Sequence, residues 1–492
     1  MPKRQNSDPP ARGTFHRFMR ISKSFLTKPV ELFDAAFHGG PTGARHPLSR
    51  LYNRHLGPIT ALRIHRPELS DFAMYTASCD HSLMSALMAD ITVRSPALET
   101  MLIPGGGKGR GMSQPVLSAL GEGSERLLAV LHFQGVVDQL EFATYGEIER
   151  GGGRALGPEQ LPLFAPEQYD SRNFRFRRFR SDLPICWHQA TDLLSGNPTW
   201  VPAQLALLYY KFRHGEQAIG YPTSGGLGFA STRRGAILHG LYEFMERDAI
   251  NIRWFCRLPP PRVDVDVGAL AAHLWPQLNW RLSTDAIKEI GIQLATIDHS
   301  IPIFTMTARD LTQDTLAFLG AGGAGGSRER ALAQVLFEMA QTRSVLKAYQ
   351  PKHAKVISPT SQTSEMTDFL DGTVYFGFRE NIKRLDWYTT HGSRIGWDEV
   401  ADFSGLDEDE EYEAILLWLR KAGFNPVVID LGSACWPGVH LVRVIIPEMT
   451  LACVAANPYL GHPRYYELAH TLGLTERRLT FSDLNTEPIP FP

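Results

Sequence analysis

The stretch LGFASTRRGAILHGLYEFMERDAI, from Leu227 to Ile250, is the one around which the expected fold is organised. Wound as a helix at about 100° per residue from Gly235 onward, it separates into two faces. The apolar face consists of Ile237, Leu241, Phe244 and Met245, and the polar face consists of His239, Glu243 and Glu246. Most polar ridges of this kind face water. This helix alone therefore leaves open whether its two carboxylates have a function.

Two further stretches repeat the pattern. SALGEGSERLLAV, residues 118–130, carries Glu122 and Glu125 on one face, and the helical stretch QVLFEMAQTR carries Glu338 and Gln341. Each helix follows a glycine-rich run, at residues 105–111, 224–228 and 320–326. Glycine lets backbone N–H groups curl around an anion, and a helix N-terminus adds positive potential. The pattern predicts phosphate sites where glycine runs open helices, with Mg²⁺ held by carboxylates of the same helices.

Neither standard nucleotide motif accounts for these runs. A Walker A loop needs Ser or Thr after its Gly-Lys pair, but Lys108 is followed by Gly109. Gly320, Gly322 and Gly325 satisfy G-x-G-x-x-G, a match that is easily met in a run so rich in glycine. Lys108 could reach a phosphate as a mobile charge or could simply be solvated.

The motifs, taken together, resemble the ATP-binding motifs of YcaO-domain proteins. Ser118-x-x-x-Glu122-x-x-Glu125-Arg126 comes first, Glu243-x-x-Glu246-Arg247 follows, and the third helix then contributes Glu338, Gln341 and Arg343. LVRVIIPEM, residues 441–449, resembles the late strand of the family. The final EPIPFP is similar to the PxPxP terminus of the azoline-forming members, so the resemblance runs from about residue 70 to the last residue.

The resemblance implies a YcaO fold of the α/β or α+β class, with sheets flanked by helices and a nucleotide site between the units of glycine run and helix. It implies ATP and Mg²⁺ as cofactors. The implied Mg²⁺ ligands are Glu122, Glu125, Glu243 and Glu246. Nucleotide contacts are implied for Lys108, Ser118, Arg126, His239, Arg247, Glu338, Gln341 and Arg343.

The tail holds the candidate catalytic group. Pro488, Pro490 and Pro492 stiffen it, which could place the carboxylate of Pro492 in the active site as a base or an orienting group. The alternative is a disordered proline-rich tail. The second motif also departs from the family, because Gly235 and His239 stand where a Glu and a Gln are common. The departure concerns the ribose and adenine contacts, whereas both Glu-x-x-Glu pairs are kept, so we expect metal binding to be kept.

The composition of the chain excludes several classes of protein, and we also predict how the chain divides into domains. With 43% hydrophobic residues, 21% charged residues and a formal charge of −2, the chain can bury a core and is not a polyanion binder overall. Its five cysteines form no C-x-x-C, and no apolar run reaches a membrane span, so we expect a cytoplasmic protein without a zinc or disulfide framework. We predict an N-terminal extension at residues 1–60, for partner docking or for packing on its own domain, and a catalytic domain at 61–492.

Two other segments allow local predictions, and the chain as a whole allows a third. FRFRRFR, residues 174–180, alternates aromatic and basic residues, which fits a half-buried strand with solvated arginines better than an RNA-binding strand. The acidic run 407–411 indicates the first turn of a solvated helix. The alternation of strands with amphipathic helices along the chain indicates an α/β or α+β enzyme.

The implied activity is an ATP-dependent cyclodehydratase that converts Cys, Ser or Thr of a ribosomal precursor peptide to azoline rings. Thioamide or amidine formation and a non-catalytic docking subunit remain as alternatives. The implied partners are the precursor peptide, an E1-like leader-binding protein and, in many such pathways, an FMN-dependent azoline dehydrogenase. We expect a homo-oligomer within such a complex, and neither a nucleic acid nor a membrane as a partner.

Overall fold

The computed structural model describes residues 47–53, 58–81, 105–109, 113–172, 174–274, 286–310, 312–353, 357–432 and 438–492. Most of the predicted N-terminal extension, at 1–46 and 54–57, lies outside these ranges. Its described part includes a short 3₁₀ turn, Pro47–Leu51, whose Leu48 and Leu51 are buried. The strand that follows begins at Ile59, so it crosses the expected boundary at residue 60. The domain division stays a prediction.

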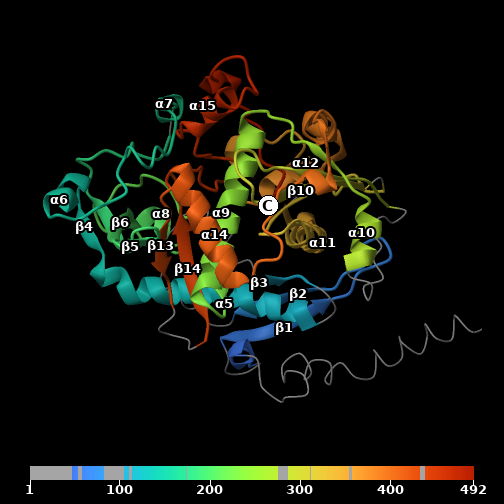
Figure 1. Ribbon diagram of the computed structural model, residues 1–492, viewed down its shortest axis with the longest axis horizontal. Coiled ribbons are helices and arrows are strands. Elements are labelled where there is room, and N and C mark those ends of the chain that lie inside the picture. Colours follow the sequence, from blue (N-terminus) through green and yellow to red (C-terminus); the bar gives the residue numbers. More distant parts are fainter. Residues whose placement is uncertain are drawn as a thin grey trace, which may run out of the picture.

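Three β-sheets organise the described chain (Figure 1). The first has the order β1-β2-β3, with bounds Ile59–His65, Thr76–His81 and Gly105–Gly107. The second has the order β11-β10-β9-β8-β12, with bounds Phe318–Ala324, Ile303–Asp310, Ile287–Leu294, Arg262–Asp264 and Arg394–Gly396. The third has the order β4-β5-β13-β14-β7, with bounds Glu141–Ala143, Ile185–Asp192, Val427–Asp430, His440–Ile445 and Leu227–Ala230, and β6, Pro198–Pro202, pairs with β5.

Three long helices pack on these sheets, one on each. They are α5, Ser113–Val136, α9, Arg233–Phe255, and α11, Arg328–His353. The shorter helices are α6, Tyr145–Arg150; α7, Pro166–Tyr169; α8, Ala203–Ala206; α10, Val267–Leu274; α12, Asp371–Gly377; α13, Asp386–Thr390; α14, Glu408–Ala422; and α15, Arg464–Thr471. Figure 1 shows α9 crossing the middle of the molecule, with α5 below it. Antiparallel pairing dominates the sheets, and β12 with β8 is a parallel pair. This mixed α/β arrangement agrees with the expected class.

The glycine runs differ from the prediction in their local structure. Two of them are strands, β3 and β11, instead of loops that open helices. A Cβ atom at Gly107 would lie 1.8 Å from a backbone oxygen of α5, and one at Gly323 would lie 2.4 Å from a backbone nitrogen of α11. At Gly228 of β7 it would lie 1.9 Å from a backbone oxygen of α9. Glycine is needed here because each long helix approaches its strand closely.

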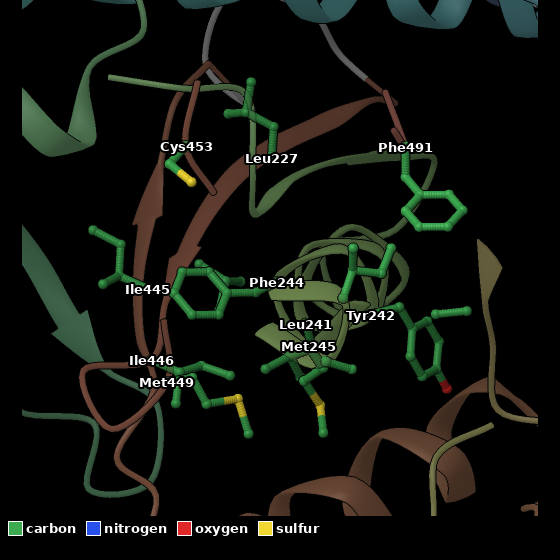
Figure 2. Packing of buried hydrophobic residues seen from close by; sticks show 14 of the residues in the cluster. Leu227, Leu241, Tyr242, Phe244, Met245, Ile445, Ile446, Met449, Cys453 and Phe491 are labelled. Atoms are coloured by element: carbon green, nitrogen blue, oxygen red, sulfur yellow. The ribbon is translucent and has the colours of Figure 1, made fainter. Parts of the chain in front are cut away.

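Helix α9 has the two faces that the sequence predicts. Its apolar residues Ile237, Leu241, Phe244 and Met245 are at most 3% exposed. Figure 2 shows Phe244 beside Ile445. Thr232 caps the helix by accepting a hydrogen bond from the backbone N–H of Gly235. The core below α9 thus fixes the direction of its polar face.

Two local predictions have different outcomes. The acidic run does begin a helix, because Asp407 forms a capping box with Glu410 at the start of α14. Residues 174–180, in contrast, form no strand. The backbone N–H of Arg177 donates to the carbonyl of Ala218 (2.8 Å), and the aromatic rings turn into the core instead of alternating across a sheet. Among the described residues, no helix is long and apolar enough to cross a membrane.

Candidate active site

A cavity of about 900 Å³ lies among the three long helices and their glycine strands. The polar ridge of α9 lines this cavity, so the helix does not present its carboxylates simply to bulk water. The facing side chains come from α5 and α11. The predicted site residues that line it are Lys108, Ser118, Glu122, Glu125, Arg126, His239, Glu243, Glu246, Arg247, Glu338, Gln341 and Pro492. Of the predicted set, Arg343 is missing from this lining.

The carboxylate pair on α5 is held by its neighbours. Glu122 accepts a hydrogen bond from the backbone N–H of Gly106 (3.0 Å), so the glycine strand β3 fixes one of its oxygens. Arg126 lies 3.4 Å from the other oxygen of Glu122 and 3.9 Å from Glu125. The side chains of these three residues are 17 to 30% exposed. One guanidinium thus serves two carboxylates and leaves negative charge facing the cavity.

The pair on α9 faces the same space with fewer direct partners. A Cβ atom at Gly322 would lie 2.6 Å from a carboxylate oxygen of Glu246, so the glycine strand β11 makes room for that side chain. Burial raises the pKa of Glu243 to about 8, opposed by Arg247 and assisted by the charges of Glu125 and Glu246. Without a cation, the cavity therefore resists full ionisation of its carboxylates.

The third helix contributes an acid and an amide, and the cation beside them comes from the first glycine run. Lys108 forms an ion pair with Glu338, and burial lowers the pKa of Lys108. Gln341 lies against Gly106, and its buried side-chain oxygen has no hydrogen-bond partner within the part of the chain that the structure describes. A buried acceptor of this kind normally has a donor. Gln341 is thus available to a donor group that enters the cavity.

The tail reaches the site through Pro492, which lines the cavity. Arg247 donates a hydrogen bond of 2.6 Å to a main-chain oxygen of Pro492. Upstream, Trp254 donates to the carbonyl of Glu487 (2.9 Å), and Phe491 is 3% exposed. The described tail is therefore packed, which opposes the alternative of a disordered segment.

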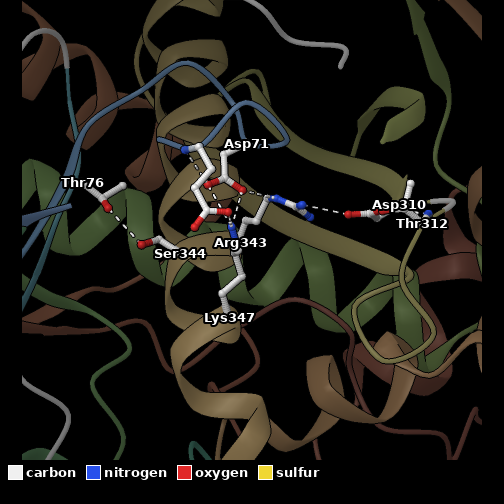
Figure 3. Close-up of polar contacts among 8 residues, drawn as sticks. Asp71, Thr76, Asp310, Thr312, Arg343, Ser344 and Lys347 are labelled. Atoms are coloured by element: carbon white, nitrogen blue, oxygen red, sulfur yellow. Dashed lines mark hydrogen bonds and ion pairs between the residues drawn. The ribbon is translucent and has the colours of Figure 1, made fainter. Parts of the chain in front are cut away.

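Arg343 lies elsewhere, in an ion-pair network shown in Figure 3. Its side chain is 2% exposed and lies 2.8 Å from Asp71 and 2.8 Å from the fully buried Asp310. Lys347 adds a second contact to Asp71, at 3.0 Å. The network attaches the connection between β1 and β2 to α11. The structure thus gives Arg343 a role in holding these elements together and does not bring it to the cavity.

With this geometry established, the comparisons identify the family. The family described as YcaO cyclodehydratase, ATP- and Mg²⁺-binding, matches residues 106–450, well over half of the chain. The chain belongs to the YcaO family. It is therefore an enzyme of a family that binds ATP and Mg²⁺. The matched residues contain the three long helices and the glycine strands around the cavity, except for the first residue of β3.

Similar proteins agree with this assignment. An uncharacterized protein of Methanothermobacter thermautotrophicus is 27% identical over 276 residues, covering 54% of this chain and 66% of the relative. A heterocyclase in complex with substrate and cofactor is 22% identical with a TM-score of 0.69, covering 90% of this YcaO chain and 56% of that chain. The E. coli microcin synthetase McbBCD complex is 12% identical with a TM-score of 0.55, covering 88% and 96%. At these identities the solved structures show a shared fold.

The carboxylates of this YcaO protein fit a magnesium site that is completed by substrate. Among the described residues, no three acidic, His or Cys side chains converge into a preformed metal cage. Mg²⁺ is usually held by one or two carboxylates together with phosphate oxygens and water. Burial also raises the pKa of Glu125 to about 6, opposed by Arg126. A divalent cation would relieve the repulsion among these carboxylates, so the donor set and its electrostatics suit Mg²⁺ bound with ATP.

The sequence reasoning missed Arg443, which lies behind the two carboxylate pairs of this YcaO site. It is 2% exposed and donates to the carbonyls of Thr223 and Gly225, each at 2.6 Å. Burial lowers its pKa to about 10, opposed by the charges of Glu243 and Glu125. An arginine in the otherwise apolar strand LVRVII was the available signal. Arg443 holds the second glycine run in place and supplies a fixed positive charge behind the acids.

A second missed residue is Arg330, on the first turn of α11. It lines the cavity and forms an ion pair with Glu411, which is 1% exposed and also accepts a hydrogen bond from Tyr242. Gly326 leaves room for Glu411, because a Cβ atom there would lie 2.5 Å from the carboxylate. The prediction that the acidic run is solvated is thus wrong for Glu411, because its side chain points inward and orients Arg330 at the cavity.

Proposed function

We propose that this YcaO protein is an ATP-dependent cyclodehydratase of ribosomal peptides. The side chain of a Cys, Ser or Thr attacks the preceding backbone carbonyl, and the former amide oxygen leaves as phosphate to close an azoline ring. The observation that carries the proposal is the seating of the PxPxP tail in the cavity, where Arg247 binds Pro492 beside Glu243 and Glu246. A thioamide-forming or amidine-forming enzyme would give this tail no evident task.

We assign binding of Mg²⁺ to Glu122, Glu125, Glu243 and Glu246. When bound, Mg²⁺ offsets the charge of the transferred phosphoryl group. Ser118, Arg126, Arg247 and Lys108 face the phosphates, and His239, Glu338 and Gln341 form the rest of the nucleotide pocket. His239 is oriented by a 3.1 Å hydrogen-bond contact with the carbonyl oxygen of Phe229. These side chains position the reacting groups and replace part of their hydration.

We assign Pro492 the catalytic role, through a free carboxylate at that residue. Its bond to Arg247 orients it, and the packed residues before it limit its movement. Such a carboxylate can take the proton of the attacking hydroxyl or thiol, or hold the amide N–H in the orientation for attack. Appending one glycine after Pro492 would move the charge by a residue. It should abolish ring formation while nucleotide binding persists, and unchanged ring formation would remove Pro492 from catalysis.

The proposed activity also involves partner proteins. We propose that a leader-binding, E1-like protein delivers the precursor peptide in the cytoplasm and that an FMN-dependent dehydrogenase oxidises azolines where azoles are made. One similar structure is a multi-protein complex, McbBCD, and another contains a bound substrate.

The direct test is mass spectrometry of a Cys/Ser/Thr-rich precursor peptide encoded beside the gene. The peptide is incubated with this protein, its leader-binding neighbour, ATP and Mg²⁺. Loss of one water per modified residue, dependent on ATP, supports a cyclodehydratase. Incorporation of sulfur at the amide when sulfide is added to the same mixture would indicate thioamide formation, and the absence of ATP hydrolysis would indicate a docking subunit.

A further inference from the structure

A run of arginines lies outside the cavity and has no part in the chemistry above. It consists of Arg172, Arg175, Arg177, Arg178 and Arg180, and we call it the arginine strip. All five side chains are exposed. The chain as a whole has a formal charge of −2, so this concentration of positive charge is local. At the reach of an extended chain the strip spans at most about 30 Å.

Most of this charge is not neutralised by the protein itself. Arg180 binds Asp182, with contacts of 2.9 and 3.1 Å. For the other four arginines, the described parts of the chain contain no salt bridge to an acidic side chain. An ion pair would be the ordinary structural use of an exposed arginine. Its absence leaves several guanidinium groups available to an external anion.

Two of these arginines are fixed by aromatic rings. The guanidinium carbon of Arg175 lies 4.7 Å from the ring centroid of Phe176, and that of Arg178 lies 4.9 Å from the centroid of Tyr169. Cation–π contacts orient a guanidinium without consuming its charge. The strip is thus partly preorganised, which lowers the entropy cost of binding a ligand.

The rings beneath the strip connect it to the cavity. Phe176 is 6% exposed, and its centroid lies 5.6 Å from that of Tyr221. Tyr221 in turn lines the cavity. Two packed rings, Phe176 and Tyr221, therefore lead from Arg175 to the cavity, which makes the strip and the cavity neighbours in the fold.

The chemistry of the strip favours a peptide carboxylate over a nucleic acid. Single-stranded nucleic acids are usually bound by exposed aromatic rings on which bases stack. Here Phe176 and Phe179 are each 6% exposed, and the guanidinium group of Arg175 lies over the ring of Phe176. The planar fork of arginine binds carboxylates in a bidentate manner without any stacking surface.

We propose that the arginine strip binds a carboxylate-rich segment of the peptide substrate while another part of the same peptide occupies the cavity. The identity of the ligand as a substrate segment rests on the proposed function. The charge complementarity itself does not, because it follows from the unpaired arginines. The strip would hold the peptide outside the reacting residues and raise its affinity without contacting the ring that forms.

The test measures binding of a fluorescein-labelled decaglutamate peptide to the full chain by anisotropy. The variants R175Q/R178Q and R172Q/R177Q each remove two unpaired charges, and R420Q/K421Q removes two exposed charges from the end of α14 as a matched control. Each strip variant should weaken binding about fivefold, as expected for two exposed ion pairs, and the control should not. Binding to the unmodified protein should weaken as salt rises from about 50 to about 200 mM.

Three results would overturn the proposal. They are equal weakening in the control variant, equal binding of a neutral Gly-Ser peptide, and tighter binding of decauridylate RNA than of decaglutamate. A second comparison separates the strip from the catalytic assignment. Ring formation should be faster on a peptide with an acidic extension than on the same peptide without it, and the strip variants should lose only that difference. If no peptide is cyclised, the proposed function fails. The anisotropy experiment still tests whether the arginine strip binds a carboxylate-rich peptide.

Discussion

Replacing Gly372 by alanine tests whether packing of the tail sets the position of Pro492. Gly372 lies in α12, and a Cβ atom there would meet the carbonyl oxygen of Ile489 at 2.1 Å. Real Cβ contacts essentially never fall below 3.0 Å, so the tail or the helix must move by about 0.9 Å. The helix itself would gain about 1 kcal/mol from alanine. Any loss of activity or stability in this variant therefore comes from the contact with the tail.

We expect two measurable consequences. A misplacement of about 1 Å at a reacting group can lower the rate about 100-fold, so ring formation by G372A should fall by that order. Overpacking costs about 1 to 3 kcal/mol, so once the helix gain of about 1 kcal/mol is subtracted the free energy of unfolding should fall by about 0 to 2 kcal/mol. ATP binding should persist, because Gly372 does not line the cavity.

The matched control is Gly135→Ala. Gly135 lies near the end of α5 and is exposed, and a Cβ atom there would meet no other atom within 4 Å. G135A should keep the full rate and be equal or slightly higher in stability. The rates are measured by mass spectrometry of the peptide, and stability by chemical denaturation. If G372A forms rings as fast as G135A does, the position of the tail does not control catalysis and our reasoning is refuted.

Three other substitutions give separate tests. E243Q should lower Mg²⁺-dependent ATP turnover by about 100-fold, with partial recovery at high Mg²⁺, and a rate within about twofold of the parent would remove Glu243 from the metal site. R343M leaves the buried Asp310 unpaired, so denaturation should show a loss of about 3 to 5 kcal/mol with nucleotide affinity of the folded protein unchanged. Weaker affinity at full stability would restore Arg343 to the nucleotide pocket. Burial and the charge of His188 lower the pKa of His132 to about 4. Because the unfolded state gains this proton at higher pH, stability should fall by about 1 to 2 kcal/mol between pH 7 and pH 5, and H132N, with no proton to gain, should fall less over that range.

Local periodicity was sufficient to predict the three long helices. The 3.6-residue repeat of Ile237, Leu241 and Phe244 fixes which face of α9 is buried. The glycine runs were placed in the right order but given the wrong local structure. These glycines are needed because helix and strand approach each other closely, and that approach depends on residues far away in the sequence. FRFRRFR alternates as a strand does, yet pairing needs a partner edge, and this segment has one backbone bond to Ala218.

The site residues were predicted through a resemblance to a family. Helix geometry decides which of them can face the cavity together. Gln341 and Arg343 are two residues apart, which is about 200° around a helix, so both cannot face one cavity. Gln341 faces it and Arg343 turns to Asp310. Arg443 was missed because its partners, carbonyl groups of the second glycine run, are more than two hundred residues away.

The most direct test of the central claim is the fate of the amide oxygen. A precursor peptide carrying a heavy-oxygen label in the carbonyl before the reacting Cys, Ser or Thr is incubated with the protein, its leader-binding partner, ATP and Mg²⁺. The proposed phosphorylation of that oxygen predicts one labelled oxygen in each phosphate released with ring formation. Ring formation that leaves the phosphate unlabelled, with the label released as water, would contradict the account.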